Sequence, residues 1–299
     1  MGVFYKSSYN KGKMLMKFKI LVDSTADISS EILEKYDITV AYLDVIMDGQ
    51  PYNSKDVTNQ EFYNHLSDCI KKKKTLPKTS AVNSYTFEQI LKDYCNLDDT
   101  FVLAFTIAKE MSNTQQALKQ AINDLNMENI YVVDTVVTTF ALGALAIEAA
   151  KLALNQNLSK DEMIEAVNDL NDRVWTYVSI ADLGCLRVGG RLSSKSMLLG
   201  SMLRLKPIVQ INKKVEVCAK SIGQGKANKW IVDHVKESMD SKYPLYFGHS
   251  NGLEILEKYK TNYGKSLNLS GDELVFEMGP VVVAHAGLGC AGIAFFKKK

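Results

Sequence analysis

Two short apolar runs constrain the fold of this chain more than any other feature. Residues 100–106 read Thr-Phe-Val-Leu-Ala-Phe-Thr, and residues 130–134 read Ile-Tyr-Val-Val-Asp. Runs with so little polar alternation are typical of strands that are buried on both faces, as in a parallel sheet. A helical pattern follows each run, at 112–126 and at 138–154. This alternation predicts a parallel sheet with helices on both of its faces.

The remaining elements divide the chain into two unlike halves. In the first half we expect strands at 18–22 and 38–46, helices at 29–36, 58–70 and 84–95, and irregular loops at 50–56 and 75–84. In the second half we expect helices at 159–173, 194–205, 225–240 and 250–263, a hairpin over 207–219, and strands at 174–182, 243–248, 272–278, 281–285 and 292–296. The mixed order of the second half indicates an α+β arrangement.

The predicted fold class is therefore α/β with two domains. Residues 1–17 read as a loosely attached extension, residues 18–155 as an N-terminal α/β domain with the parallel sheet, and residues 156–299 as a C-terminal α+β domain with a mixed sheet. The boundary is expected between 155 and 173. A chain of 299 residues is long enough for each domain to bury its own core.

Composition excludes several functional classes. A net charge of +2 with scattered lysines argues against a nucleic-acid partner. The five cysteines have no metal or redox spacing and fit reduced thiols in the cytoplasm. The longest apolar stretch, 136–154, contains Glu148 and Lys151, so we expect a buried helix and no integral membrane segment. The four histidines are isolated, and we expect a monomer without metal or cofactor.

The stretch from Gly279 to Gly289 contains an unusually placed histidine. Residues 281–284 read Val-Val-Val-Ala, which predicts a buried strand that leads to His285, and small residues bracket the ring. One interpretation is a core histidine bonded to a backbone carbonyl, and this stretch alone favours it. The other interpretation is that His285 closes the polar end of an apolar pocket.

Hydroxyl side chains recur where apolar segments give way to helices. They occur in Ser24-Thr25, in Thr79-Ser80 and in Ser112-Asn113-Thr114. In a parallel sheet these junctions share the carboxyl edge of the strands, where ligands bind. The helix N-termini there favour an anion such as a carboxylate or phosphate. The alternative is that each hydroxyl is an ordinary helix cap.

Two arginines, Arg187 and Arg191, flank the sequence Val188-Gly189-Gly190. The paired glycines predict a tight turn that directs Arg191 at a nearby group. With His285 it would form a cationic wall opposite the hydroxyls. The apolar helices 138–154 and 194–205 are either plain core or the lining of a cavity, to which the second would contribute Met197, Leu198, Leu199, Met202 and Leu203.

In these motifs the chain resembles the DegV family of bacterial fatty-acid-binding proteins, from about Lys19 to Phe296. The stretches that carry the resemblance are Asp23-Ser24-Thr25-Ala26-Asp27-Ile28, Lys78-Thr79-Ser80, Met111-Ser112-Asn113-Thr114, residues 186–193 (Leu-Arg-Val-Gly-Gly-Arg-Leu-Ser), Lys206-Pro207-Ile208, and Gly279-Pro280-Val281 through His285 to Gly289. Their order and spacing together make the resemblance specific.

The resemblance implies a protein that binds one long-chain fatty acid and performs no chemistry itself. The carboxylate would lie at the domain interface and the acyl chain in a buried tunnel. The family's carboxylate-binding positions correspond here to Ser80 with Thr79 beside it, Ser112 and His285, with Arg191 nearby. The resemblance also implies a partner, an ATP-dependent fatty-acid kinase that makes an acyl phosphate for phospholipid synthesis.

The chain departs from the family pattern at several positions. The departures are Ala108-Lys109, Asn113, residues 81–84 (Ala-Val-Asn-Ser), Leu288, and residues 221–226 (Ser-Ile-Gly-Gln-Gly-Lys), where members that work with the kinase are usually rich in arginine. These changes affect kinase coupling more than binding, so a carrier without a kinase partner stays open. A further alternative is a hydrolase or transferase acting on an acyl or phosphate ester, with Ser112 or Ser80 as nucleophile and His285 as general acid–base.

Overall fold

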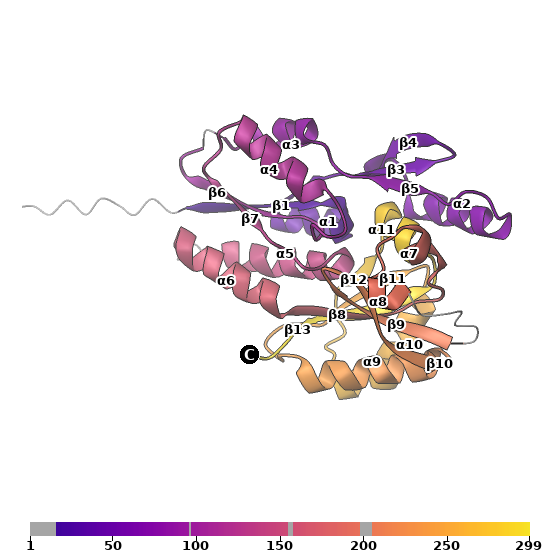
Figure 1. Cartoon of the computed structure of the whole chain (residues 1–299). Coiled ribbons are helices and arrows are strands. Elements are labelled where there is room, and N and C mark those ends of the chain that lie inside the picture. The colour runs from indigo at the N-terminus through magenta and orange to yellow at the C-terminus, as the bar shows by residue number, and fades with distance from the viewer. Residues whose placement is uncertain (1–15, 96, 155–157, 198–204) are drawn as a thin grey trace, which may run out of the picture.

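The structure of the chain is a computed structural model that describes residues 16–95, 97–154, 158–197 and 205–299 (Figure 1). The first of its three sheets is the predicted parallel one. Its strands, in spatial order, are β2 (Ile38–Ala41), β1 (Lys17–Asp23), β6 (Thr100–Phe105) and β7 (Ile130–Val133). All neighbouring pairs are parallel, and every residue of β6 is buried. The apolar runs at 100–106 and 130–134 therefore form adjacent strands of a parallel sheet, as the sequence predicts.

Helices cover both faces of this sheet, as predicted. Helices α3 (Ser84–Leu91) and α4 (Thr114–Asp124) lie above it in Figure 1, and α5 (Thr139–Ala153) and α6 (Lys160–Arg173) lie below it. The short helix α1 (Ser30–Tyr36) packs against β2 and α5.

The second sheet is mixed, which confirms the predicted character of the C-terminal half. Its strands, in spatial order, are β10 (Lys214–Ile222), β9 (Leu205–Asn212), β8 (Val174–Ser179), β13 (Cys290–Phe296), β11 (Tyr246–Ser250) and β12 (Val275–Glu277). Only the β11–β12 pair is parallel. Helices α9 (Gln224–Ser238) and α10 (Leu253–Leu267) cover the outer face of this sheet (Figure 1). The hairpin of β9 and β10 turns at Lys213, as predicted.

Helix α5 lies between the two large sheets and is buried along most of its length. Two glycines allow this close packing. A Cβ on Gly143 would overlap the carbonyl oxygen of Ala26 and lie 2.6 Å from the ring of Phe276. A Cβ on Gly248 of β11 would overlap the ring of Phe140. One apolar core therefore runs from the parallel sheet through α5 to the mixed sheet.

A third, small antiparallel sheet was not expected from the sequence. It consists of β4 (Gln50–Asn53), β3 (Asp44–Met47) and β5 (Lys78–Ser80). The predicted strand 38–46 is in fact two strands, β2 and β3, which belong to different sheets. The predicted loops 50–56 and 75–84 contain β4 and β5. Next to this sheet lies α2 (Asn59–Lys71), which begins at a capping box of Thr58 and Glu61 close to the predicted start.

The predicted strand 281–285 is wrong, because this segment is helix α11 (Pro280–Ala286). Three β-branched valines favour a strand by propensity. The flanking residues favour a helix: Gly279 is extended at the N-cap, Pro280 occupies the first turn, and Gly287 ends the helix with φ +78°. Val281, Val283 and Ala284 are buried, so tertiary packing decides the conformation.

The predicted helix 194–205 begins at the predicted residue but does not include Leu205. Helix α8 covers Ser194–Met197, and Leu205 already belongs to β9. Residues 198–204, and with them the predicted lining residues Leu198, Leu199, Met202 and Leu203, lie outside the described residues. Before α8, residues Gly184–Val188 form helix α7.

The ends of the two predicted domains are only partly described. Strand β1 begins at Lys17, within the predicted extension 1–17, whereas residues 1–15 lie outside the described residues. Residues 155–157, at the predicted boundary, lie outside them too. Helix α6 packs against α5 and β7, on the side of the first sheet. We retain the division into 18–155 and 156–299, with its boundary in 155–173, as a proposal.

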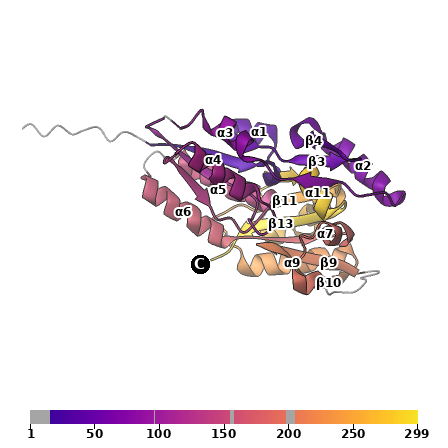
Figure 2. The ribbon, with the colours of Figure 1, turned by 45° about the horizontal axis from the view of Figure 1, so that its top comes forward.

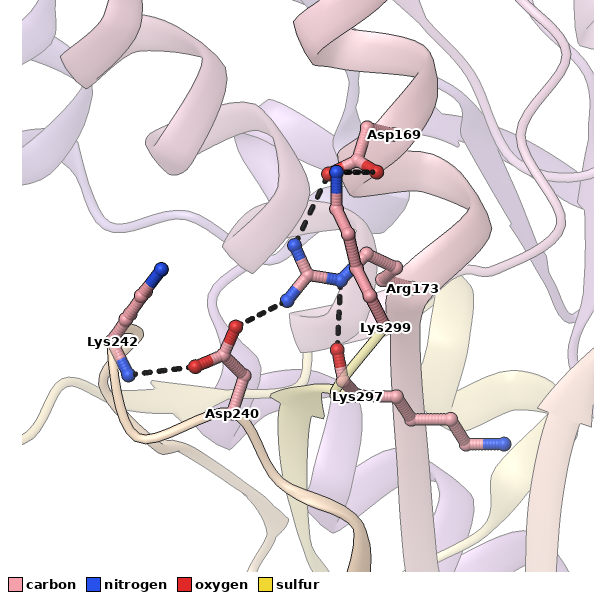
Figure 3. A network of polar contacts seen from close by, with 6 residues as sticks. All are labelled: Asp169, Arg173, Asp240, Lys242, Lys297 and Lys299. Atoms are coloured by element: carbon pink, nitrogen blue, oxygen red, sulfur yellow. Dashed lines mark hydrogen bonds and ion pairs between the residues drawn. The ribbon is translucent and has the colours of Figure 1, made fainter.

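A polar network joins the end of α6 to the last residues of the chain (Figure 3). The guanidinium of Arg173 donates to the carbonyl oxygen of Lys297 at 2.7 Å, to Asp169 at 3.1 Å and to Asp240 at 2.5 Å. Lys299 adds an ion pair with Asp169 at 2.9 Å. These contacts hold the C-terminal tail, which follows β13, against α6.

Candidate ligand-binding site

An apolar cavity lies among elements of both halves. It encloses about 680 Å³ of space free of protein atoms, its opening to solvent included. Residues beyond the carboxyl ends of β1, β6 and β7 contribute to its wall, as expected for a ligand site on a parallel sheet. Most of the wall is aliphatic, and its apolar residues include Ile107, Val178, Val209, Ile211, Val281 and Val282.

Helix α11 carries His285 to this cavity. The helix packs against α7 on one side and against β3 and β5 on the other, and Figure 2 shows α7 and α11 side by side. His285 Nε2 and Thr79 Oγ1 are 2.8 Å apart, within hydrogen-bonding distance. Thr79 is half-buried in β5, and both residues line the cavity. The contact therefore joins residues that are 206 positions apart in the chain.

The ring of His285 is uncharged at neutral pH. Burial lowers its pKa to about 4, and the nearby charge of Arg191 adds to this effect. His285 Nδ1 is buried and has no hydrogen-bond partner within the described ranges. The cationic wall that the sequence predicts from Arg191 and His285 is therefore carried by Arg191 alone at neutral pH.

Arg191 lines the same cavity and is held by backbone carbonyls. Its Nε donates to the carbonyl oxygen of Met111 at 3.2 Å, and its Nη1 donates to that of Gly189. Burial lowers the pKa of the guanidinium, although arginine keeps its charge at any physiological pH. The paired glycines form the expected turn after α7, with Gly190 at φ +70°.

The two predicted serines do not line the cavity. Ser80 is exposed, because side chains alternate along β5 and Thr79 faces α11. Ser112 Oγ is 2.9 Å from Thr114 Oγ1 and accepts from the Thr114 N–H at 3.3 Å, as in a local cap. Of the five predicted site residues, the structure brings Thr79, His285 and Arg191 to one cavity.

Three further polar residues in or beside the cavity wall are not among the site residues that the sequence predicts. Thr138 and Thr139 line it at the start of α5, after β7, and they follow the same rule of hydroxyls at strand-to-helix junctions that pointed to Ser112. Asp27 accepts hydrogen bonds from the Gly279 N–H at 2.8 Å and from Thr139 Oγ1 at 2.7 Å. Burial raises the pKa of Asp27 to about 8. This carboxyl group therefore joins the N-termini of α5 and α11.

The geometry supports ligand binding better than covalent catalysis. The hydrogen-bond partner of His285 is a threonine, and neither Ser80 nor Ser112 bonds to the ring in the described parts of the chain. A ring with a pKa of about 4 is a weak general base at neutral pH. Within the same ranges, no group of three or more His, Cys, Asp or Glu residues is placed to hold a metal ion, and no helix is long and apolar enough to cross a bilayer.

Comparisons with known proteins agree with this architecture. The family model described as "Uncharacterised protein, DegV family" matches residues 17–298. The DegV domain-containing protein lin1977 of Listeria innocua is 29% identical over 284 residues, which cover 94% of this chain and 99% of that protein.

Solved structures also match over nearly the whole chain. The fatty acid binding DegV family protein SAG1342 of Streptococcus agalactiae is 26% identical with a TM-score of 0.83, covering 95% of this chain and 100% of that one. DegV of Bacillus subtilis, also described as a fatty acid binding protein, is 25% identical with a TM-score of 0.78 and the same coverage. A DegV family protein of Thermus thermophilus, at 23% identity and a TM-score of 0.82, shares the fold.

Proposed function

Because the chain belongs to the DegV family, we propose that it binds one long-chain fatty acid in the apolar cavity, with the carboxylate near Thr79, His285 and Arg191. The observation that carries the proposal is the hydrogen bond between Thr79 and His285 in a mostly aliphatic wall. The relatives from Streptococcus agalactiae and Bacillus subtilis, described as fatty-acid-binding proteins, support the same class of ligand.

Two free-energy terms decide whether a fatty acid binds in such a cavity: burial of the acyl tail and hydrogen bonding of the carboxylate. Burying an acyl tail of about 15 methylenes contributes on the order of 12 kcal/mol before the costs of association, at roughly 0.8 kcal/mol for each methylene. The carboxylate must be hydrogen-bonded, because a buried unpaired charge is very costly. Arg191 supplies a positive charge, and Thr79 supplies a hydroxyl donor when its oxygen accepts from His285 Nε2.

Ser80 and Ser112 lie outside the cavity wall and are less directly placed to bind the carboxylate. Each lies next to a residue of the cavity wall, Thr79 and Met111 respectively. We propose them as secondary contacts that need a local rearrangement, since Ser80 faces solvent and Ser112 is bonded to Thr114.

We further propose that the protein performs no chemistry and presents the bound acid to a separate ATP-dependent kinase in the cytoplasm. The five free thiols fit a reducing compartment. The segment 221–226, which joins β10 to α9, is largely exposed and carries Lys226 as its single cation. Reconstitution with a fatty-acid kinase tests this part, and absence of acyl phosphate with a loaded carrier would favour storage or sensing without a kinase.

Bound lipid is the first test of the proposed function. The purified protein is denatured and extracted with organic solvent, and the extract is analysed by mass spectrometry. We expect about one long-chain fatty acid per chain, or saturable binding of palmitate by the delipidated protein. Absence of both would refute the proposal.

The variant His285→Ala tests where the carboxylate binds. We expect palmitate affinity to fall about tenfold or more, because the Thr79 hydroxyl loses the ring that orients it towards the carboxylate; a hydrogen bond to a charged group contributes about 1.5–3 kcal/mol, and each 1.4 kcal/mol is tenfold. His65→Ala is the matched control, because His65 lies in α2 and is absent from the cavity wall. If His285→Ala unfolds the protein more than it weakens binding, His285 is a core residue.

A further inference from the structure

Thr138 is a polar residue of the cavity wall without an assigned role. Its side chain is almost fully buried, at 8% exposed, and it lines the cavity. In the part of the chain that the structure describes, its Oγ1 has no hydrogen-bond partner. Buried hydroxyls are normally bonded, because leaving one without a partner is destabilising. The cavity wall therefore contains a hydroxyl that a ligand can satisfy.

The other three threonines of the wall are already bonded. Thr25 Oγ1 donates to Asp23 at 2.5 Å, and Thr139 Oγ1 donates to Asp27 at 2.7 Å. Thr79 Oγ1 is paired with His285. Thr138 thus differs from its neighbours in a property that bears directly on ligand binding.

Thr138 is also the N-cap of α5, a helix of 15 residues. Its backbone is extended (φ −151°, ψ −177°), and its side chain makes no capping hydrogen bond to the first turn. The first N–H groups of a helix have no intrahelical partner, and they carry the positive end of the helix dipole. The first turn holds no acidic residue. This end of α5 is therefore suited to an anion.

The nearest carboxyl group does not oppose an anion at this position. Asp27 contacts the start of α5 through Thr139 Oγ1. Burial raises the pKa of Asp27 to about 8, so this group is largely protonated at neutral pH. Asp23, at the end of β1, has its pKa raised to about 6 by burial and is mostly ionised at neutral pH, but its oxygens are bonded to Thr25 and to the Ile107 N–H. Arg191, on the same cavity, adds a positive charge.

We propose that Thr138 and the N-terminus of α5 hydrogen-bond the carboxylate of the bound fatty acid, opposite Thr79. This inference rests on the proposed function and adds a ligand contact to it. The Thr138 hydroxyl donates to one carboxylate oxygen, and the Thr79 hydroxyl donates to the other while it accepts from His285 Nε2. The carboxylate is thereby held by α5 and β5, both from the first half of the chain, and His285 of α11, from the second half, orients the Thr79 hydroxyl.

The variant Thr138→Val tests this contact, because valine keeps the shape of threonine and removes only the hydroxyl. We expect the delipidated variant to be at least as thermally stable as the wild type, since an unbonded buried hydroxyl is lost. We expect palmitate to bind about tenfold more weakly or worse. Hexadecanol, which has the same chain and no carboxylate, should lose less than threefold. Thr138→Ser, which keeps the hydroxyl, should bind palmitate within threefold of the wild type.

Thr106→Val is the matched control. Thr106 is 1% exposed, its Oγ1 likewise has no partner within the described ranges, and it is absent from the cavity wall. Thr106→Val, like Thr138→Val, should be at least as thermally stable as the wild type, and it should bind palmitate with unchanged affinity. Equal palmitate affinity of Thr138→Val and wild type, or an equal loss in Thr106→Val, would overturn the inference. Absence of palmitate binding by the wild type would instead refute the proposed function, and this inference with it.

Discussion

At the scale of single residues, burial decides which groups around the cavity carry charge. The His285 ring is uncharged at neutral pH, whereas Arg191 stays protonated. Attraction for an anion therefore comes from Arg191, and the contribution of His285 is to orient the Thr79 hydroxyl. Asp27 shows the opposite effect, because burial raises its pKa to about 8 and keeps its proton where an exposed aspartate has lost it.

The raised pKa of Asp27 makes stability depend on pH with a definite sign. The folded chain holds this proton up to about pH 8, and the unfolded chain releases it near pH 4. The stabilisation is complete below pH 4 and is lost as pH rises to 8, at up to about 1.4 kcal/mol per pH unit. We expect Asp27→Asn, which keeps a similar shape without titrating, to lose less stability than the wild type between pH 5 and pH 8.

Urea unfolding at several pH values measures this difference. Asp172→Asn is the matched control, because Asp172 is exposed on α6 and its replacement should leave the pH profile unchanged. Asp23, with its pKa raised to about 6, contributes to both profiles below pH 6. Parallel profiles of wild type and Asp27→Asn above pH 6 would contradict the expectation.

At the scale of elements, the contact between α7 and α11 positions His285. Gly189, directly after α7, lies against the ring, and a Cβ there would overlap His285 Nδ1. Its φ of −71° is accessible to any residue, so the requirement for glycine comes from the ring and not from the backbone. This close approach fixes the ring where Nε2 reaches Thr79.

We expect Gly189→Ala to displace the ring and to weaken palmitate binding about tenfold, with a loss of stability of about 1–3 kcal/mol from overpacking. The loss of stability should largely disappear in the double variant with His285→Ala, because the ring that the methyl group meets is gone. Gly225→Ala in α9 is the matched control, since a Cβ there meets nothing within 4 Å. Calorimetric unfolding and palmitate titration of Gly189→Ala, His285→Ala, the double variant and Gly225→Ala test this. If Gly189→Ala lowers stability as much in the His285→Ala background as in the wild type, the expectation is wrong.

Several elements show how far the sequence predicts this fold. Strand β6 can be recognised from its sequence because burial on both faces leaves a continuous apolar run, and β7 has the same apolar character although it is a half-buried edge strand. Strand β5 reads Lys-Thr-Ser and exists through its pairing with β3, more than 30 positions earlier, which no local pattern reveals. The three valines of α11 favour a strand by propensity, which explains the wrong prediction. The positions of Gly279, Pro280 and Gly287 at the two ends of the segment indicate the helix.

The sequence predicts part of the candidate site, and the rest depends on side-chain direction and burial. Thr79, His285 and Arg191 were selected for residue type and for resemblance to a family motif, and the structure places all three on one cavity. The sequence predicts Ser80 as the contact, with Thr79 beside it, because the direction of each side chain follows from β5, which the sequence does not predict. Thr138 was overlooked although it follows β7 as Ser112 follows β6, since only burial distinguishes an unbonded hydroxyl from an ordinary cap.

At the scale of the whole molecule, the two large sheets share one apolar core on their facing sides, and the mixed sheet has a second core under α9 and α10 on its outer face. Helix α5 packs against both, and the buried apolar cluster includes residues from each half. The cavity is built the same way, with β5 and the start of α5 on one side and β8 to β10 with α11 on the other. A ligand held there contacts both halves at once, so we expect binding to stabilise the whole chain and not one half of it.

The Arg173 network joins α6, which packs beside the parallel sheet, to the last residues of the mixed sheet's half (Figure 3). Arg173 ends α6, next to the parallel sheet, and bonds to Lys297 after β13 and to Asp240 before β11. Arg173→Met removes the cation and leaves two carboxylates and a carbonyl oxygen without it. Because Arg173 is only 9% exposed, we expect the free energy of unfolding to fall by about 2 kcal/mol.

Urea unfolding of Arg173→Met beside Lys229→Met separates this network from an ordinary surface pair. Lys229 and Asp233 are 2.6 Å apart, but their side chains are 65% and 53% exposed, so the loss of stability there should be clearly smaller. Palmitate affinity should be unchanged in both variants, because neither arginine nor lysine at these positions lines the cavity. Equal losses of stability in the two variants would show that the network contributes no more than a surface ion pair. In that case α6 would be held in place by its packing against α5 and β7.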